Sequence, residues 1–149
     1  MILVHSPAKI MARWLIVNGH GVAPSGPPPG PDWQVTSPML PDDLPDNRIS
    51  VAGTGAVLQG MEHRTKEAVE KHNIQIRIRG KTDDIAHAKG ATIQEAIRQI
   101  VWQEVIIGSN VYIVEAAVVY SPLAWIGQEE QNKRNSYTIN LRATIRSNP

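Results

Sequence analysis

The chain has 149 residues, of which 42% are hydrophobic and 19% charged, and its formal net charge is +1. This length and apolar content fit a single domain, 1–149, with a buried core. The near-neutral charge argues against a strongly basic nucleic-acid binder, although local basic patches remain compatible with it. Without cysteine the chain has no disulfide, thiolate metal site or thiol nucleophile. Its apolar start, interrupted by Lys9 and Arg13, is too short to span a bilayer, so we expect a soluble cytosolic product with no membrane partner.

A short N-terminal helix and a proline-rich connector are predicted first. Ser6-Pro7 is typical of a helix start and Asn18-Gly19 of a helix end. Apolar side chains surround most of the helix between them, so it should be buried on more than one side. Residues 24–45 then hold eight of the eleven prolines. Because proline lacks an amide donor, we expect an extended connector there, with 33–36 as a short edge strand.

Two strands with one apolar face are predicted on either side of a charged segment. Residues 47–52 alternate in polarity, and a glycine pair, Gly53 and Gly55, should end that strand. Ile74, Ile76 and Ile78 alternate with polar residues in a second strand. The intervening residues 53–71 have little to bury, so we expect a mobile excursion that becomes ordered against a partner.

A long helix followed by two more strands completes the predicted fold. Apolar residues at helical spacing predict a helix from about 83 to 103 that begins at Thr82 or Asp83 and lies along the sheet. Residues 111–120 are apolar on both faces, so this strand is either covered on both sides or provides an association surface. A connector at 121–135 leads to a last strand at 138–146. We therefore expect an α+β fold: a mixed, mainly antiparallel sheet of about four to five strands, with the long helix and the short N-terminal helix packed on one face.

The sequence contains no convincing catalytic or metal-binding constellation. The five histidines share no ligand spacing. The adjacent acidic pairs are better explained by helix capping or solvation than by acid–base catalysis. No serine has the context of a nucleophile elbow, and the glycines match neither a phosphate-binding loop nor a dinucleotide-binding turn. We expect no enzyme activity, no cofactor and no metal.

The strand periodicities place many arginines on the sheet face away from the helices. This face would be either a solvated surface, a contact with nucleic-acid backbone, or a surface that pairs with carboxylates of a protein partner. Base-reading sheets carry aromatic residues where this sheet carries arginine, which disfavours RNA recognition. The predicted partner- or channel-facing residues are Arg48, Arg77, Arg79, Arg142 and Arg146.

A tryptophan beside an arginine is a second feature that points to an interface. On the predicted helix, Trp102 lies opposite the apolar face and near Arg98. This composition is typical of an interface anchor, and local packing under a loop is the alternative.

Motifs between about residues 40 and 147 resemble the tail terminator proteins (minor tail or tail completion proteins) of long-tailed bacteriophages. The resemblance begins with Pro45-Asp46-Asn47-Arg48-Ile49-Ser50-Val51 and a glycine-rich turn. It continues with Ile74-Gln75-Ile76-Arg77-Ile78-Arg79-Gly80, a helix with Ala86, and a late segment with Pro122, Gly127, Arg134 and Asn140. The proline-rich residues 24–45 depart from the compact members of that family.

The resemblance implies a virion protein of the tail at its neck end, present in host cytoplasm during assembly. Such a subunit forms a homo-oligomeric ring, usually a hexamer, that caps the tail tube, stops its polymerisation and joins the head connector. The implied partners are the chain itself, the tail tube protein and a head-completion protein, with passing contact to genomic DNA. The expected lateral contacts are the 98–102 helix surface and, in the 53–71 excursion, Met61, Glu62, Arg64 and Lys66.

Two other function classes fit the sequence. A different neck or head-to-tail connector subunit would share the size and the ring habit. A DNA-binding protein would use the arginine-rich face of the sheet, and its affinity for duplex DNA would fall steeply with salt.

Overall fold

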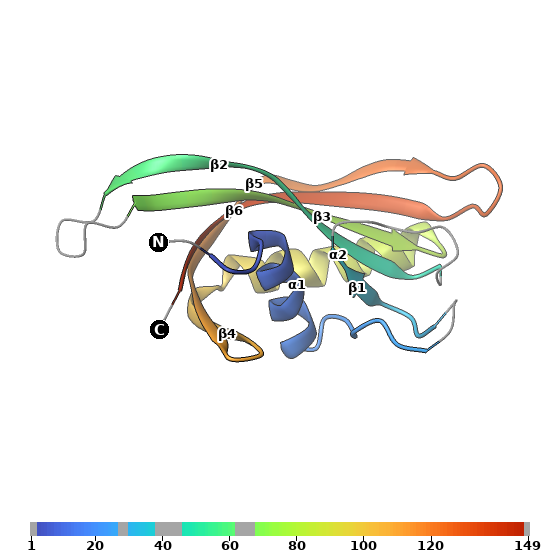
Figure 1. Cartoon of the computed structure of the whole chain (residues 1–149). Coiled ribbons are helices and arrows are strands. Elements are labelled where there is room, and N and C mark those ends of the chain that lie inside the picture. The colour runs from blue at the N-terminus through green and yellow to red at the C-terminus, as the bar shows by residue number, and fades with distance from the viewer. Residues whose placement is uncertain (1–2, 27–29, 38–45, 62–67, 148–149) are drawn as a thin grey trace.

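A computed structural model describes residues 3–26, 30–37, 46–61 and 68–147, with backbone alone for 57–61 and 68–70. Within these ranges six strands form one curled sheet, and two helices lie on the same side of it (Figure 1). The mixed α+β fold is therefore confirmed, but the expectation of four to five strands was too low. The elements in chain order are α1 (Pro7–Val17), β1 (Gln34–Thr36), β2 (Arg48–Met61), β3 (Ala68–Gly80), α2 (Asp83–Arg98), β4 (Val101–Ile107), β5 (Asn110–Gln128) and β6 (Asn135–Ser147).

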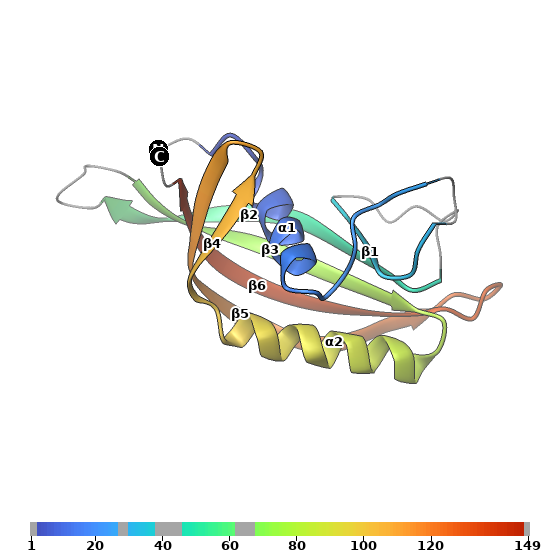
Figure 2. The ribbon, with the colours of Figure 1, turned by 90° about the horizontal axis from the view of Figure 1, so that it is seen from below.

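The sheet has the strand order β1-β2-β3-β6-β5-β4. β1 runs parallel to β2, and the other neighbouring strands are antiparallel. The alternation predicted for β3 is confirmed, because Ile74, Ile76 and Ile78 are fully buried. They meet apolar side chains of α1 and α2 in one core. Figure 2 shows both helices against this face, with α2 running along the sheet.

Both helices begin where the sequence predicts. The Ser6 side chain accepts a hydrogen bond from the backbone N–H of Lys9, and that of Thr82 accepts one from Ile85. The predicted end of the long helix at Gln103 is wrong, because α2 ends at Arg98. The β-branched residues that follow form β4, in which side chains of this shape pack well. Neither helix of the described chain is long and apolar enough to cross a membrane.

The predicted excursion at 53–71 is largely a β-hairpin. β2 does not end at the glycine pair but continues to Met61, with a register shift between Gly53 and Gly55. β3 already begins at Ala68, so the expectation of an irregular segment is wrong on both sides of 62–67. Residues 62–67 lie outside the described part of the chain. Figure 1 shows the paired strands β2 and β3 extending past the helices, at the end of the sheet opposite the β5–β6 turn.

β5 is longer than predicted, and it changes faces partway along. Residues 121–128, expected in a connector, belong to this strand. A register shift between Val114 and Ala116 leaves Glu115 as an extra residue, and an extra residue exchanges the two faces of a strand. Val114 is therefore buried in the core, whereas Val118, which alternation would place beside it, is 58% exposed.

Candidate assembly surfaces

Two of the five arginines expected on an exposed sheet face are buried. Arg48 is 0% and Arg79 1% exposed, and they lie opposite each other on β2 and β3. Arg48 donates to the side-chain oxygen of Gln34 at 3.1 Å, and Arg79 donates to the backbone oxygen of Asp46 at 3.4 Å. The expectation that this pair faces a partner or channel is therefore wrong in this conformation of the subunit. Their guanidinium groups are instead buried and hydrogen-bonded within the subunit, at the end of the sheet where β2 begins.

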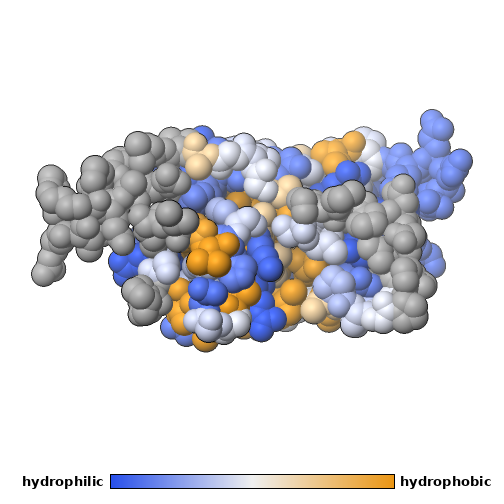
Figure 3. Space-filling view, viewed as in Figure 1, coloured by the Kyte–Doolittle hydropathy of each residue, from blue (hydrophilic) through white to orange (hydrophobic). Residues whose placement is uncertain are grey.

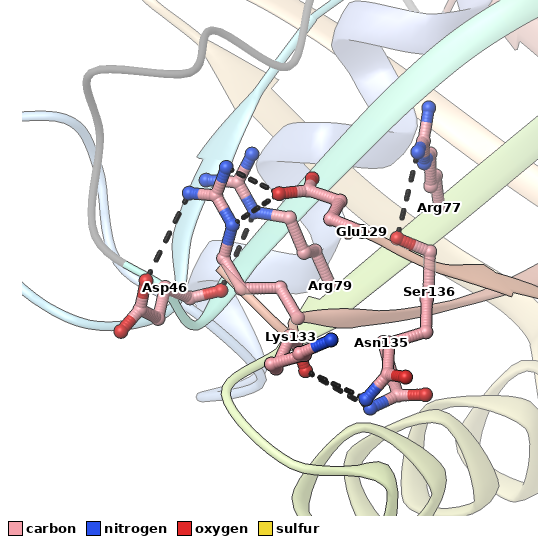
Figure 4. A network of polar contacts seen from close by, with 9 residues as sticks. Asp46, Arg77, Arg79, Glu129, Lys133, Asn135 and Ser136 are labelled. Carbon is pink, nitrogen blue, oxygen red and sulfur yellow. Dashed lines mark hydrogen bonds and ion pairs between the residues drawn. The ribbon is translucent and has the colours of Figure 1, made fainter. Parts of the chain in front are cut away.

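An ion-pair cluster closes the same end of the sheet (Figure 4). The buried Arg134 contacts the Glu129 carboxylate at 2.6 and 2.7 Å and the Asp46 carboxylate at 3.8 Å. Partial burial acts to raise the pKa of Glu129, but the hydrogen bond and charge of Arg134 hold it below its ordinary value. The cluster thus joins the β5–β6 turn to the segment that enters β2.

The remaining three arginines differ in exposure and in whether an acidic side chain pairs with the guanidinium. Arg77 is half-buried and reaches the Ser136 hydroxyl at 3.5 Å. Arg142 is exposed; it donates to Asn73 at 2.9 Å and stacks on the ring of Tyr120. Arg146 forms an ion pair with Glu115 at 3.2 Å. The outer face therefore offers less free positive charge than the sequence suggested.

Trp102 is exposed as predicted, but it is not on a helix. It lies in β4 with φ 49°, a conformation that non-glycine residues rarely adopt, and it is 57% exposed. The guanidinium of Arg146 lies 4.7 Å from the centre of its ring. Arg98 is at the end of α2, where it contacts Glu95 at 4.0 Å. The expected joint helix surface at 98–102 is thus wrong, because the chain passes from helix to strand between the two residues.

Exposed apolar side chains follow β4 and β5 on the face away from the helices. Val101 is paired with Ala116, and Val118 with Arg142, which places Val118 on the arginine face. Figure 3 shows apolar surface over β4 among polar patches. Large exposed apolar residues also occur further along these strands, at Ile106, Trp125 and Ile126. We call the four near the β4–β5 pairing at Ala116 the outer strip: Val101 (69% exposed), Trp102 (57%), Val118 (58%) and Tyr120 (47%).

A groove lies between α1 and the turn that joins β4 to β5. Its volume is about 350 Å³, and it is lined by Lys9, Ala12, Arg13, Ile16, Ile107 and Gly108. The four α1 residues share one helix face, since they follow the spacing i, i+3, i+4, i+7. The sequence shows Lys9 and Arg13 as the polar residues of an otherwise apolar helix, but it does not show the groove, because the groove depends on where the β4–β5 turn packs against α1.

The other expected lateral contact lies mostly beyond what the structure describes. Met61 is the last residue of β2, and its side chain is outside the described part, as are Glu62, Arg64 and Lys66. Their predicted role stays a prediction.

Three titratable side chains that could be considered for chemistry, His5, His20 and Tyr137, have structural partners. The His5 ring is 2.7 Å from the Tyr112 hydroxyl, and His20 stacks on Trp14. The Tyr137 hydroxyl donates to Asp83 at 2.5 Å, and this bond raises the pKa of Tyr137 to about 12. No three His, Asp or Glu side chains in the described ranges come together as metal ligands.

Comparison with known proteins yields no family assignment. No family model matches the chain, and no curated protein matches it. Among solved structures, a chain from the virion of a native gene transfer agent particle is similar with 14% identity and a TM-score of 0.42, covering 76% of this chain and 78% of that one. Another, whose recorded name states no function, has 10% identity and a TM-score of 0.46, covering 95% and 91%. At these low values, neither likeness shows a fold family or a function.

Proposed function

We propose that this chain is a structural virion protein, a tail terminator that forms a ring on the end of a phage tail tube. In this role it stops tube polymerisation and presents the surface to which the head attaches. The proposal rests on the motif resemblance over residues 40–147 and on the exposed outer strip. The likeness to the gene transfer agent chain is too weak to add support.

The outer strip is the observation that carries the proposal. Its four large apolar side chains lie outside a core that is already complete on the other face of the sheet. Grouped exposure of this kind is typical of a protein–protein contact, and tryptophan and tyrosine are common interface anchors. A partner that covers the strip would also desolvate the stacked guanidinium groups of Arg142 and Arg146, which strengthens such contacts.

A closed ring requires two different contact patches on each subunit, because each copy meets its two neighbours through different surfaces. The outer strip provides one type of surface. The β2–β3 hairpin, which extends away from the body of the molecule, provides a second candidate and includes Met61, one of the four predicted contact residues.

Duplex DNA binding is the less favoured alternative. Strong non-specific binding needs several free cations on one surface. Of the five arginines expected to supply them, Arg48 and Arg79 are buried and Arg146 is paired with Glu115. The other alternative is a neck connector subunit, which would form the same kind of ring as a terminator. It would differ in which proteins contact the two faces of that ring.

The decisive experiment is imaging of virions assembled without this protein. We expect tails of uncontrolled length and heads without tails, because nothing would stop tube growth or bridge to the head. Tails of normal length that merely lack heads would favour the connector alternative. A separate titration with duplex DNA at two salt concentrations tests the remaining alternative, which predicts tight, strongly salt-dependent binding.

A further inference from the structure

The α1 groove combines an apolar floor with two cations at its rim. Ala12, Ile16 and Ile107 supply the apolar lining, and Lys9 and Arg13 are exposed beside it. Arg13 donates to the backbone oxygen of Ile106 at 3.3 Å, a contact that positions the side chain without neutralising its charge. No acidic residue lines the groove. Its chemistry therefore suits an aliphatic side chain that adjoins a carboxylate.

The first turn of α2 offers that combination. Asp84 is exposed, and the next residue, Ile85, is 39% exposed although it is large and apolar. Two other acidic side chains at this end are engaged, since Asp83 accepts a hydrogen bond from Tyr137 and Glu129 pairs with Arg134. Asp84 and Ile85 are thus an adjacent acid and aliphatic residue that the fold leaves at the surface.

Groove and helix start lie far apart on one subunit. Figure 2 shows α2 beginning at the end of the sheet away from β4, whereas the groove lies beside the β4–β5 turn. The groove and the start of α2 therefore lie on different parts of the surface of one subunit. A contact between them joins different patches of two copies, which is the head-to-tail type that closes into a ring.

We propose that the α1 groove receives the first turn of α2 from a second copy, with Ile85 on the apolar floor and Asp84 against Lys9 and Arg13. This inference rests on the proposed ring and assigns one of its lateral contacts. The contact is additional to whatever surface covers the outer strip.

Charge reversal and mixing test the contact. One variant carries Lys9→Glu and Arg13→Glu, and the other carries Asp84→Lys. Each alone places like charges at every contact, so we expect the apparent association constant to fall by about tenfold or more. Mixed in equal amounts, the two variants can alternate around a ring with every contact matched. We expect light scattering to show assembly recovered in the mixture alone, with thermal unfolding confirming that each variant is folded.

The control is Lys133→Glu, an exposed charge reversal in the β5–β6 turn, which should leave assembly unchanged. If the unmodified chain assembles but the reversals have no more effect than this control, or if mixing restores nothing, the proposed contact is wrong while the ring stands. If the unmodified chain stays monomeric with and without tube protein, the ring and the contact both fall. A second mixture pairs the Lys9→Glu, Arg13→Glu variant with a Glu130→Lys chain. If assembly recovers with Asp84→Lys but not with Glu130→Lys, the groove is occupied by α2 and not by the neighbouring β5–β6 turn.

Discussion

Gly80 lies so close to Ala86 that there is no room for a side chain between them. A Cβ on Gly80 would lie 2.7 Å from the backbone nitrogen of Ala86 and 2.8 Å from its Cβ. Glycine at this corner lets β3 pass directly beneath the first turns of α2. The Arg-Gly corner that carries much of the family resemblance thus has a packing reason in this chain.

Gly80→Ala should destabilise the fold by about 1–3 kcal/mol, because the obstructing atoms belong to backbone that cannot move aside. Gly53→Ala is the matched control, since nothing lies within 4 Å of a Cβ at that strand position. It should be neutral or stabilising by up to about 1 kcal/mol. Urea unfolding measures both free energies. Equal effects at the two sites would refute the packing explanation.

Arg134→Gln should destabilise the chain by roughly 1–3 kcal/mol, because it removes the charged partner of Glu129 and Asp46 at a buried position. Glu129→Gln should cost a similar amount, because it leaves the buried Arg134 guanidinium without its nearest carboxylate. Glu130→Gln, which changes an exposed neighbour, should have almost no effect. Chemical denaturation measures the free energy of unfolding of the three variants and so gives the order of their effects. A loss for Glu130→Gln as large as for Arg134→Gln would contradict the role given to the cluster.

Trp102→Gly should separate assembly from folding. Glycine relieves a left-handed backbone strain of roughly 1–2 kcal/mol, which offsets the lost stacking with Arg146 of about 0.5–1 kcal/mol. We therefore expect subunit stability within about 1 kcal/mol of the unmodified chain and clearly weaker assembly. Trp102→Ala keeps the strain and serves as the comparison. Unchanged assembly in both variants would exclude Trp102 from the interface.

Tyr137 should lose its proton only at about pH 12 in the folded chain, mainly because it donates a hydrogen bond to Asp83. Its ordinary pKa is 10.0, so the stability it contributes is complete below pH 10 and is lost as the pH rises towards about 12. Asp83→Asn should lower the pKa of Tyr137. Ultraviolet titration, with Tyr137→Phe to identify the signal, measures the change. An identical titration curve in Asp83→Asn would contradict the assignment.

The regular parts of the fold were predictable because their signals are local. Strict alternation at Ile74, Ile76 and Ile78, and the capping residues Ser6 and Thr82, each act within one element. The start of β4 was assigned to the helix because Ile100 and Val101 are apolar at positions that also fit the helix before them, and tertiary pairing with β5 decides between the two.

The candidate surfaces were harder to predict because they depend on long-range pairing. One extra residue at Glu115 exchanges the faces of β5, so alternation alone groups the exposed Val118 with the buried Val114. Arg48 and Arg79 alternate along β2 and β3 with apolar core residues, but their own burial depends on contacts with residues such as Gln34 and Asp46. No periodicity within β2 or β3 contains that information.

The central claim is that this chain assembles into a ring that ends a tail tube. The most direct test is the mass of the purified protein in solution, alone and with polymerising tube protein. The proposal predicts a closed species, six times the subunit mass of 16.4 kDa if the ring is the usual hexamer, on its own or on tube ends, with tube growth halted. A species that stays at 16.4 kDa under both conditions, while tubes keep growing, would contradict it.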